Sequence, residues 1–322
     1  MKSPFFISAV IATGILAVSC ASILVRACPE VPPLVISSYR LGLASIVVFS
    51  LALSRRRSIR MPSKTDFLLG ILGGFFLSLH FTAWITSLNY TSVARSVVLV
   101  TTNPLFVGLL SWIVFGEKPA LSLAVGIVLS LAGSAMLALS GPATQSSVNA
   151  RSAMLFGDML AVCGAVAASC YLLVGSRLRP RMATLEYICL VYGSCSLFLI
   201  GFTILSGLQF TGYSQKTYFL LAVMALIPQL IGHTAFNWSL RYLSAGMVSL
   251  TILGEPLGAS VMAYFILGES VTLPQFAGMG LILSGIIIGS ASGWKPAYQA
   301  AGNGKDPSCQ NPLPIRNGTA GE

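Results

Sequence analysis

Two stretches that lie 152 residues apart decide the fold, 96-SVVLVTTNPLFVGLLSWIVFGE-117 and 248-VSLTILGEPLGASVMAYFILGE-269. Each is an apolar run with a proline in its first half and a closing Gly-Glu pair. A helix needs about 20 mainly apolar residues to cross the hydrocarbon core of a bilayer. Each stretch therefore predicts a membrane-spanning helix, and their likeness indicates a duplicated chain.

The likeness extends without gaps over residues 82–141 and 234–293 at the same spacing. Two unrelated apolar segments share some residues by chance, but matches of Pro, Gly and Glu do not easily arise in this way. A second set of matches lies further upstream. Gly14, Ala17, Ser19 and Cys20 recur as Gly164, Ala167, Ser169 and Cys170. Internal repeats of this length are typical of transporters built from two related halves.

The composition excludes a soluble fold. Of the 322 residues, 55% are hydrophobic and 9% are charged, whereas soluble domains carry about 25% charged residues. The apolar residues form long runs and not the short alternating patterns of barrel strands. We therefore expect a bundle of membrane-spanning helices.

The sequence predicts an all-α polytopic membrane protein with ten transmembrane helices arranged as two inverted five-helix repeats. An odd number of spans in each half forces the second half to enter the membrane from the opposite side. The expected spans are 5–26, 32–53, 66–88, 91–115, 120–140, 153–175, 183–207, 217–240, 245–267 and 273–294. The expected units are a first repeat at 1–140, a linker loop at 141–152, a second repeat at 153–294 and a disordered cytoplasmic tail at 295–322.

Clusters of basic residues predict the orientation. The link after the second span carries Arg55, Arg56, Arg57, Arg60 and Lys64, and the link after the sixth carries Arg177, Arg179 and Arg181. The positive-inside rule assigns both loops, and with them both termini, to the cytoplasm. The net charge of +10 is thereby explained by topology, and no nucleic-acid partner is expected. The seven cysteines are scattered without metal-ligand spacing, so we expect no metal site. No cofactor is expected. No catalytic residues are expected either, because His80 and His233 have no neighbouring acid-base pair in the sequence.

The chain resembles the ten-span EamA-type members of the drug/metabolite transporter (DMT) superfamily. The resemblance depends on Arg40 in the second span, on Gly116-Glu117-Lys118-Pro119 after the fourth, and on Glu255-Pro256 within the ninth. Further parts of it are Gly268-Glu269 after the ninth span and the Tyr171 to Arg177 pattern that closes the sixth. It implies cytoplasmic termini, a bacterial inner membrane and a central cavity open to one side at a time. It also implies export or exchange of amino acids or other small metabolites.

Glu255 and its repeat partner Asn103 are the first candidates for a binding site. An ionisable group in mid-membrane costs about 2.5–3.5 kcal/mol on insertion scales, which makes it a functional candidate. Both residues precede a proline, Pro256 and Pro104, which frees a backbone carbonyl and kinks the helix. Glu255 either binds a cationic group or a coupling proton, or it holds Arg40 in a structural pair.

Polar residues at helical spacing add further candidates. Gln229, His233 and Asn237 share one face of the eighth span, as do His80 and Trp84 on the third. They either line a cavity or form hydrogen bonds between helices. Trp84 and Trp238 could stack on a solute, and Arg40 could bind a carboxylate. Gly116 and Gly268 are expected as hinges or helix caps. The full predicted substrate-binding set is Arg40, His80, Trp84, Asn103, Gln229, His233, Asn237, Trp238 and Glu255.

The predicted function is secondary transport of a small metabolite by alternating access, with the solute among spans one, three, four, six, eight and nine. The chain has no phosphate-binding loop of the G-x-x-x-x-G-K-[ST] kind, so ATP is not expected to drive it directly. The alternatives are a channel, an accessory subunit and a membrane-embedded lipid enzyme. The expected partners are a small-molecule substrate and the lipid bilayer. The sequence leaves a coupling proton and a homodimer open.

Overall fold

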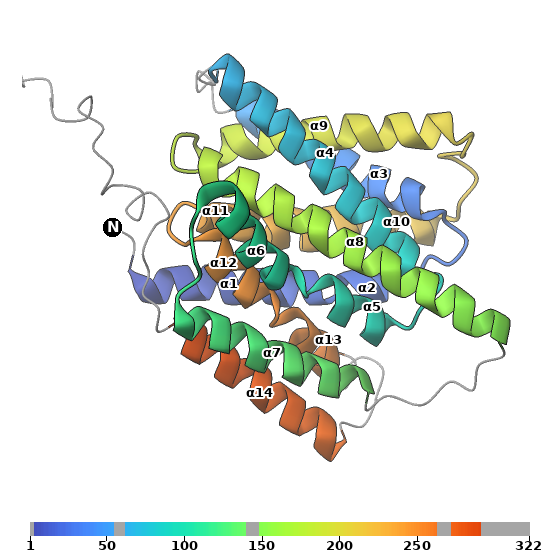
Figure 1. Cartoon of the computed structure of the whole chain (residues 1–322). Coiled ribbons are helices and arrows are strands. Elements are labelled where there is room, and N and C mark those ends of the chain that lie inside the picture. The colour runs from blue at the N-terminus through green and yellow to red at the C-terminus, as the bar shows by residue number, and fades with distance from the viewer. Residues whose placement is uncertain (1–2, 55–61, 140–147, 263–271, 291–322) are drawn as a thin grey trace, which may run out of the picture.

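The computed structural model describes residues 3–54, 62–139, 148–262 and 272–290, and every regular element in these ranges is a helix. Nine helical segments there are long and apolar enough to cross a membrane, and Leu121–Leu137 adds a shorter apolar helix. All ten predicted spans therefore correspond to helices. In Figure 1 the axes of the long helices are roughly aligned across the bundle.

Six spans are single helices and four are interrupted. The single helices are α3 (Pro33–Ser54), α4 (Lys64–Ser87), α7 (Leu121–Leu139), α8 (Val148–Leu178), α9 (Thr184–Leu205) and α14 (Leu273–Ser290). The first span is α1 (Pro4–Ser19) with α2 (Ala21–Arg26), and the fourth is α5 (Val93–Val100) with α6 (Asn103–Phe115). The eighth is α10 (Gln215–Met224), the π-helical segment η1 (Ala225–His233) and α11 (Thr234–Ser239), and the ninth is α12 (Ala245–Ile252) with α13 (Glu255–Met262).

The fourth and ninth spans are broken where the sequence predicted kinks. Two non-helical residues separate α5 from α6, and two separate α12 from α13. Pro104 and Pro256 lie in the first turn of the second helix of each pair, where the missing N–H costs nothing and the fixed φ suits a helix start. The result is two half-helices that begin inside the bundle.

Other breaks also follow from local chemistry. Pro228 lies inside η1, and a residue without an N–H favours the wider π-helical turn there. Gly116 caps α6 in the left-handed region with φ 69°, as expected for a glycine that ends a helix. The matching Gly268 lies outside the described residues.

The contacts between helices repeat in the two halves. α4 packs on α8 as η1 packs on α1, and α6 packs on α8 as α13 packs on α1. Single hydrogen bonds repeat as well. Ser19 Oγ shares its proton between the Ile15 carbonyl at 2.7 Å and the Glu255 carbonyl at 3.2 Å. Ser169 Oγ shares its proton in the same way between the Ala165 carbonyl at 2.7 Å and the Asn103 carbonyl at 3.0 Å. Each serine thus ties the start of a half-helix, α13 or α6, to the first span of one half.

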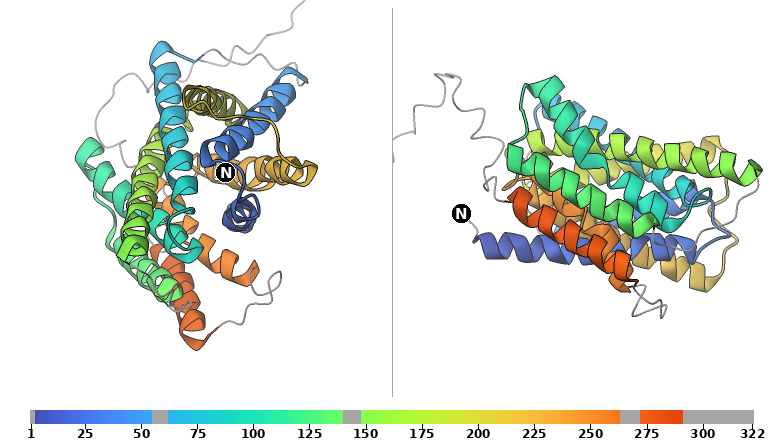
Figure 2. Two further views of the ribbon diagram at one scale, coloured as in Figure 1. Left: turned by 90° about the vertical axis from the view of Figure 1, so that its right-hand side faces the viewer. Right: turned by 60° about the horizontal axis from the view of Figure 1, so that its bottom comes forward.

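The fifth and tenth spans, α7 and α14, lie side by side at one edge of the bundle (Figures 1 and 2). Glycines bring their backbones together, because a Cβ at Gly126 would lie 2.5 Å from the Gly285 carbonyl and one at Gly133 would lie 2.4 Å from the Gly278 carbonyl. Small residues allow this approach in membranes, where packing and not water drives helix association. The remaining eight spans are left to surround the interior.

Candidate functional site

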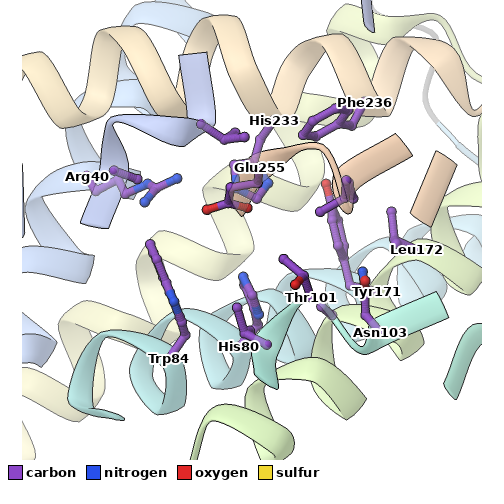
Figure 3. Close-up of a pocket in the computed structure, with 15 residues that line it drawn as sticks. Arg40, His80, Trp84, Thr101, Asn103, Tyr171, Leu172, His233, Phe236 and Glu255 are labelled. Carbon is purple, nitrogen blue, oxygen red and sulfur yellow. The ribbon is translucent and has the colours of Figure 1, made fainter. Parts of the chain in front are cut away.

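One cavity lies at the centre of the eight spans (Figure 3). It contains about 610 Å³ of atom-free space, part of which is open to solvent. Its lining residues come from spans one, three, four, six, eight and nine, the set predicted from the sequence, and Arg40 reaches it from the second span. Six of the nine predicted binding residues lie in its wall, namely Arg40, His80, Trp84, Asn103, His233 and Glu255.

Arg40 is fully buried on α3 and has no acidic partner among the described residues. Its Nε donates to Gln229 Oε1 at 3.0 Å, and its guanidinium lies over the Phe81 ring at 4.3 Å from the ring centre. Its Nη1 is buried without a hydrogen-bond partner. Gln229 and Phe81 therefore fix the guanidinium and leave its Nη1 group without a hydrogen-bond partner.

Glu255 and Asn103 lie at the starts of the two half-helices, and both line the cavity. Among the described residues the Glu255 carboxylate has no direct ion pair and no side-chain hydrogen bond, and it interacts with the Arg40 charge only at longer range. In Figure 3 the side chains of Arg40 and Glu255 point toward one another. Asn103 Oδ1 is likewise buried without a partner.

His80 and Trp84 form one wall of the cavity on α4. Their rings are parallel, with an interplanar angle of 4° and centres 6.2 Å apart. His80 Nδ1 lies 2.9 Å from the Gly164 carbonyl, and because a carbonyl only accepts, Nδ1 must carry the proton. In the neutral ring Nε2 is then a hydrogen-bond acceptor. Trp84 Nε1 is a buried donor without a partner, and the His233 ring centre lies 6.4 Å from that of His80.

Three predicted binding residues lie behind the cavity wall. Gln229 supports Arg40, and Trp238 packs against Tyr242 with ring centres 4.6 Å apart. Asn237 is fully buried, and its amide is occupied. Its Oδ1 accepts from the Tyr171 hydroxyl, and its Nδ2 donates to the Tyr192 hydroxyl at 3.1 Å. Gln229 and Asn237 therefore connect helices, Trp238 contacts a tyrosine four residues further along the chain, and none of the three lines the cavity.

Two further residues, Thr101 and Tyr171, line the cavity and are absent from the predicted binding set. Thr101 lies in the break between α5 and α6, next to Asn103. Tyr171 lies in the second half of α8, at the start of the Tyr171 to Arg177 pattern that is part of the family resemblance. That pattern was the available signal.

The wall of the cavity thus combines unpaired charges with unpaired polar atoms. Leaving a buried polar group without a hydrogen bond costs about 1–3 kcal/mol. Here a guanidinium N–H, an indole N–H and an amide oxygen are all without partners, and a carboxylate lies beside them. The cavity offers complementary groups to a polar molecule that carries both charges. No group of three or more His, Cys, Asp or Glu in the described part of the chain could hold a metal ion.

Comparison with known proteins finds the same family twice in this chain. The model of the EamA-like transporter family matches residues 4–139 and 155–290. The uncharacterized transporter YetK of Bacillus subtilis is 23% identical over 277 residues, which cover 84% of this chain and 83% of YetK. The uncharacterized inner membrane transporter YicL of Salmonella typhimurium is 25% identical over 250 residues, which cover 75% of this chain and 76% of YicL.

A solved crystal structure shares the fold with a TM-score of 0.73 at 17% sequence identity, covering 90% of this chain and 98% of that one. At this identity the likeness concerns the fold alone. The doubled family match, the related transporters and the membrane-spanning helices of the described residues agree with one another. The chain therefore belongs to the EamA-like transporter family of the DMT superfamily and is an integral membrane transporter, not an enzyme.

Proposed function

We propose that the chain is a secondary transporter that carries a small zwitterionic metabolite, an amino acid or a related solute, through the central cavity by alternating access. The observation that carries this proposal is the set of three buried polar atoms without partners in the cavity wall, Arg40 Nη1, Trp84 Nε1 and Asn103 Oδ1. A bound solute would supply their missing hydrogen bonds.

The solute's carboxylate is placed at Arg40, with Trp84 Nε1 as a second donor. Its ammonium group is placed between the Glu255 carboxylate and Asn103 Oδ1. Charge-assisted hydrogen bonds of this kind are about twice as strong as neutral ones. His80 and His233 complete the wall, and protonation of Glu255 or of a histidine is the proposed route of any coupling to protons.

Two inverted halves, residues 1–140 and 153–294 joined by the linker 141–152, are the proposed moving units. Transporters of this architecture place the solute between the halves and expose it to one side at a time. The proposed location is the bacterial inner membrane with both termini in the cytoplasm. Export or exchange is the proposed direction, as in the transporters that the chain resembles.

A thermal-shift screen of the purified protein against amino acids, their amides and their decarboxylated amines tests the binding mode. A bound ligand raises the unfolding temperature by mass action. We expect the largest shifts with zwitterions and smaller shifts with amides and amines. In Arg40→Gln and in Glu255→Gln the shift with a zwitterion should fall to that smaller size. Asp66→Asn is the matched control, because it removes a carboxylate that pairs with Arg181 away from the cavity. Equal shifts for the amines and the amino acids would exclude the carboxylate site at Arg40.

A further inference from the structure

The two ends of the central cavity are built from repeat-related positions. Trp84 on α4 and Phe236 on α11 stand 152 residues apart, and both line the cavity. The packing behind them repeats as well. One turn before each ring, a backbone carbonyl lies close to a glycine of the facing helix: a Cβ would lie 3.5 Å from that carbonyl at Gly164 and 3.4 Å at Gly14. The backbone is thus arranged alike at the two ends, and the difference between them comes from the side chains.

The end formed by the first half is polar. Arg40 Nη1 and Trp84 Nε1 are buried N–H donors without hydrogen-bond partners in the part of the chain that the structure describes. In Figure 3 these two side chains lie together on one side of the cavity, and Glu255 lies between them and the other side. The proposed binding mode places the solute's carboxylate at this polar end and its ammonium group beside Glu255.

The opposite end is formed by the second half and is mainly apolar. Its residues are Tyr171 and Leu172 on α8 and Phe236 on α11, and Figure 3 shows all three on the side of Glu255 away from Arg40. Each is buried within the protein and lines the cavity. Where the polar end has an indole N–H, the repeat-matched Phe236 offers only a phenyl ring.

The distances between neighbouring groups agree with this order. The Arg40 guanidinium lies 4.3 Å from the centre of the Phe81 ring, which lies 5.1 Å from that of His233. The His233 ring centre in turn lies 6.3 Å from that of Phe236. A row of rings therefore runs beside the cavity from the polar end to the apolar end.

The hydroxyl protons near the apolar end are already used. The Tyr171 hydroxyl donates to Asn237 Oδ1 behind the wall, and the Thr101 hydroxyl donates to carbonyls of α5. Asn103 lies beside these residues in Figure 3, and its Oδ1 receives the ammonium group in the proposed binding mode. A solute group that extends past Asn103 would meet the Leu172 side chain and aromatic rings.

We propose that the apolar end, Tyr171, Leu172 and Phe236, receives the side chain of the solute and selects amino acids with an apolar side chain of about leucine or phenylalanine size. The inference rests on the proposed function for the position of the carboxylate and the ammonium group. Each methylene that leaves water for this surface raises the affinity about fourfold. A charged side chain would lose its hydration there without gaining a partner. The selected solute contacts both halves at once, since its carboxylate meets the first and its side chain the second.

Titration calorimetry of the purified protein with two matched series of compounds tests the inference. The first series is alanine, leucine, phenylalanine and lysine. The second consists of ethylamine, isoamylamine and phenethylamine, which carry the side chains of the first three without the carboxylate. We expect leucine and phenylalanine to bind about tenfold or more tighter than alanine, and lysine to bind more weakly than leucine.

Two variants change the apolar end itself. Leu172→Asn keeps the size of the side chain and adds an amide, and Phe236→Ala removes the ring. In each, the ratio of leucine to alanine affinity should fall about fivefold or more. Phe198→Ala is the matched control, because Phe198 packs against Phe75 at 5.3 Å between ring centres and lines no part of the cavity. It should keep the native ratio.

The unfolding temperature without ligand shows which variants are folded, and Leu172→Asn alone suffices if Phe236→Ala does not fold. Equal affinities for alanine and leucine, lysine binding as tightly as leucine, or a native ratio in the folded variants would overturn the inference. If only the amines bind, and the longer apolar ones bind more tightly, the proposed carboxylate site is refuted and the apolar end stands. No binding in either series would refute both.

Discussion

Replacing Gln229 by glutamate changes one group behind the cavity and should abolish high-affinity binding of a solute carboxylate. The substitution keeps the shape of the side chain and puts a negative oxygen about 3 Å from Arg40 Nε, since the present Gln229 Oε1 lies at 3.0 Å. The guanidinium, now unpaired, would gain a permanent partner. A solute carboxylate would then meet a neutralised site.

The size of the effect follows from Coulomb's law. A solute carboxylate on the cavity side of the guanidinium would lie about 6 Å from the new charge, and at an effective dielectric constant of about 20 the repulsion is on the order of 2–3 kcal/mol. This corresponds to a loss of about 100-fold in affinity. Titration calorimetry with a ligand from the thermal-shift screen measures it directly.

Two comparisons separate this electrostatic effect from damage to the fold. Gln229→Met removes the hydrogen bond without adding charge and should weaken binding much less than glutamate does. The amine that lacks the carboxylate should bind Gln229→Glu as well as it binds the native protein, because no repulsion acts on it. Native affinity of a zwitterion for Gln229→Glu would refute the placement of the carboxylate at Arg40.

Three further outcomes are expected. Gly285→Leu should lower the unfolding temperature in detergent by an amount equivalent to about 1–3 kcal/mol, because its side chain would enter the α7 backbone, whereas Gly280→Leu on the open face of the same helix should have little effect. Ser19→Ala and Ser169→Ala should each cost about 1 kcal/mol of stability in denaturant titrations, since each removes one buried hydroxyl whose proton is shared between two carbonyls. A large difference between the two variants would contradict the symmetry of the halves. Glu255→Gln should flatten the pH profile of solute flux in liposomes if its carboxyl carries the coupling proton, and a profile unchanged from that of the native protein would exclude this role.

The sequence alone predicted the ten spans because their signal is local and strong. The Asn103-Pro104 and Glu255-Pro256 pairs also located the two breaks, because a proline interrupts the backbone hydrogen bonds of any helix. The sequence could not reveal that the interruptions are complete or that η1 is π-helical, because both depend on how neighbouring helices supply partners for the freed backbone groups.

The candidate site was predicted in part for a related reason. Helical spacing places Gln229, His233 and Asn237 on one face, but it does not say which of them meets open space and which meets another side chain. Asn237 is turned to two tyrosines from α8 and α9, and Gln229 meets an arginine 189 residues away in the chain. Only the packing of distant segments decides between these outcomes.

Counterflow in proteoliposomes tests the central claim, that one solute at a time crosses through the cavity between the two halves. Vesicles loaded with an unlabelled zwitterion identified by the thermal-shift screen are diluted into the labelled compound, and labelled uptake is followed. The account predicts saturable uptake that the internal solute accelerates, that Arg40→Gln abolishes and that Asp66→Asn leaves intact. Uptake that rises in proportion to concentration without acceleration, as through a channel, or undiminished exchange in Arg40→Gln, would contradict it.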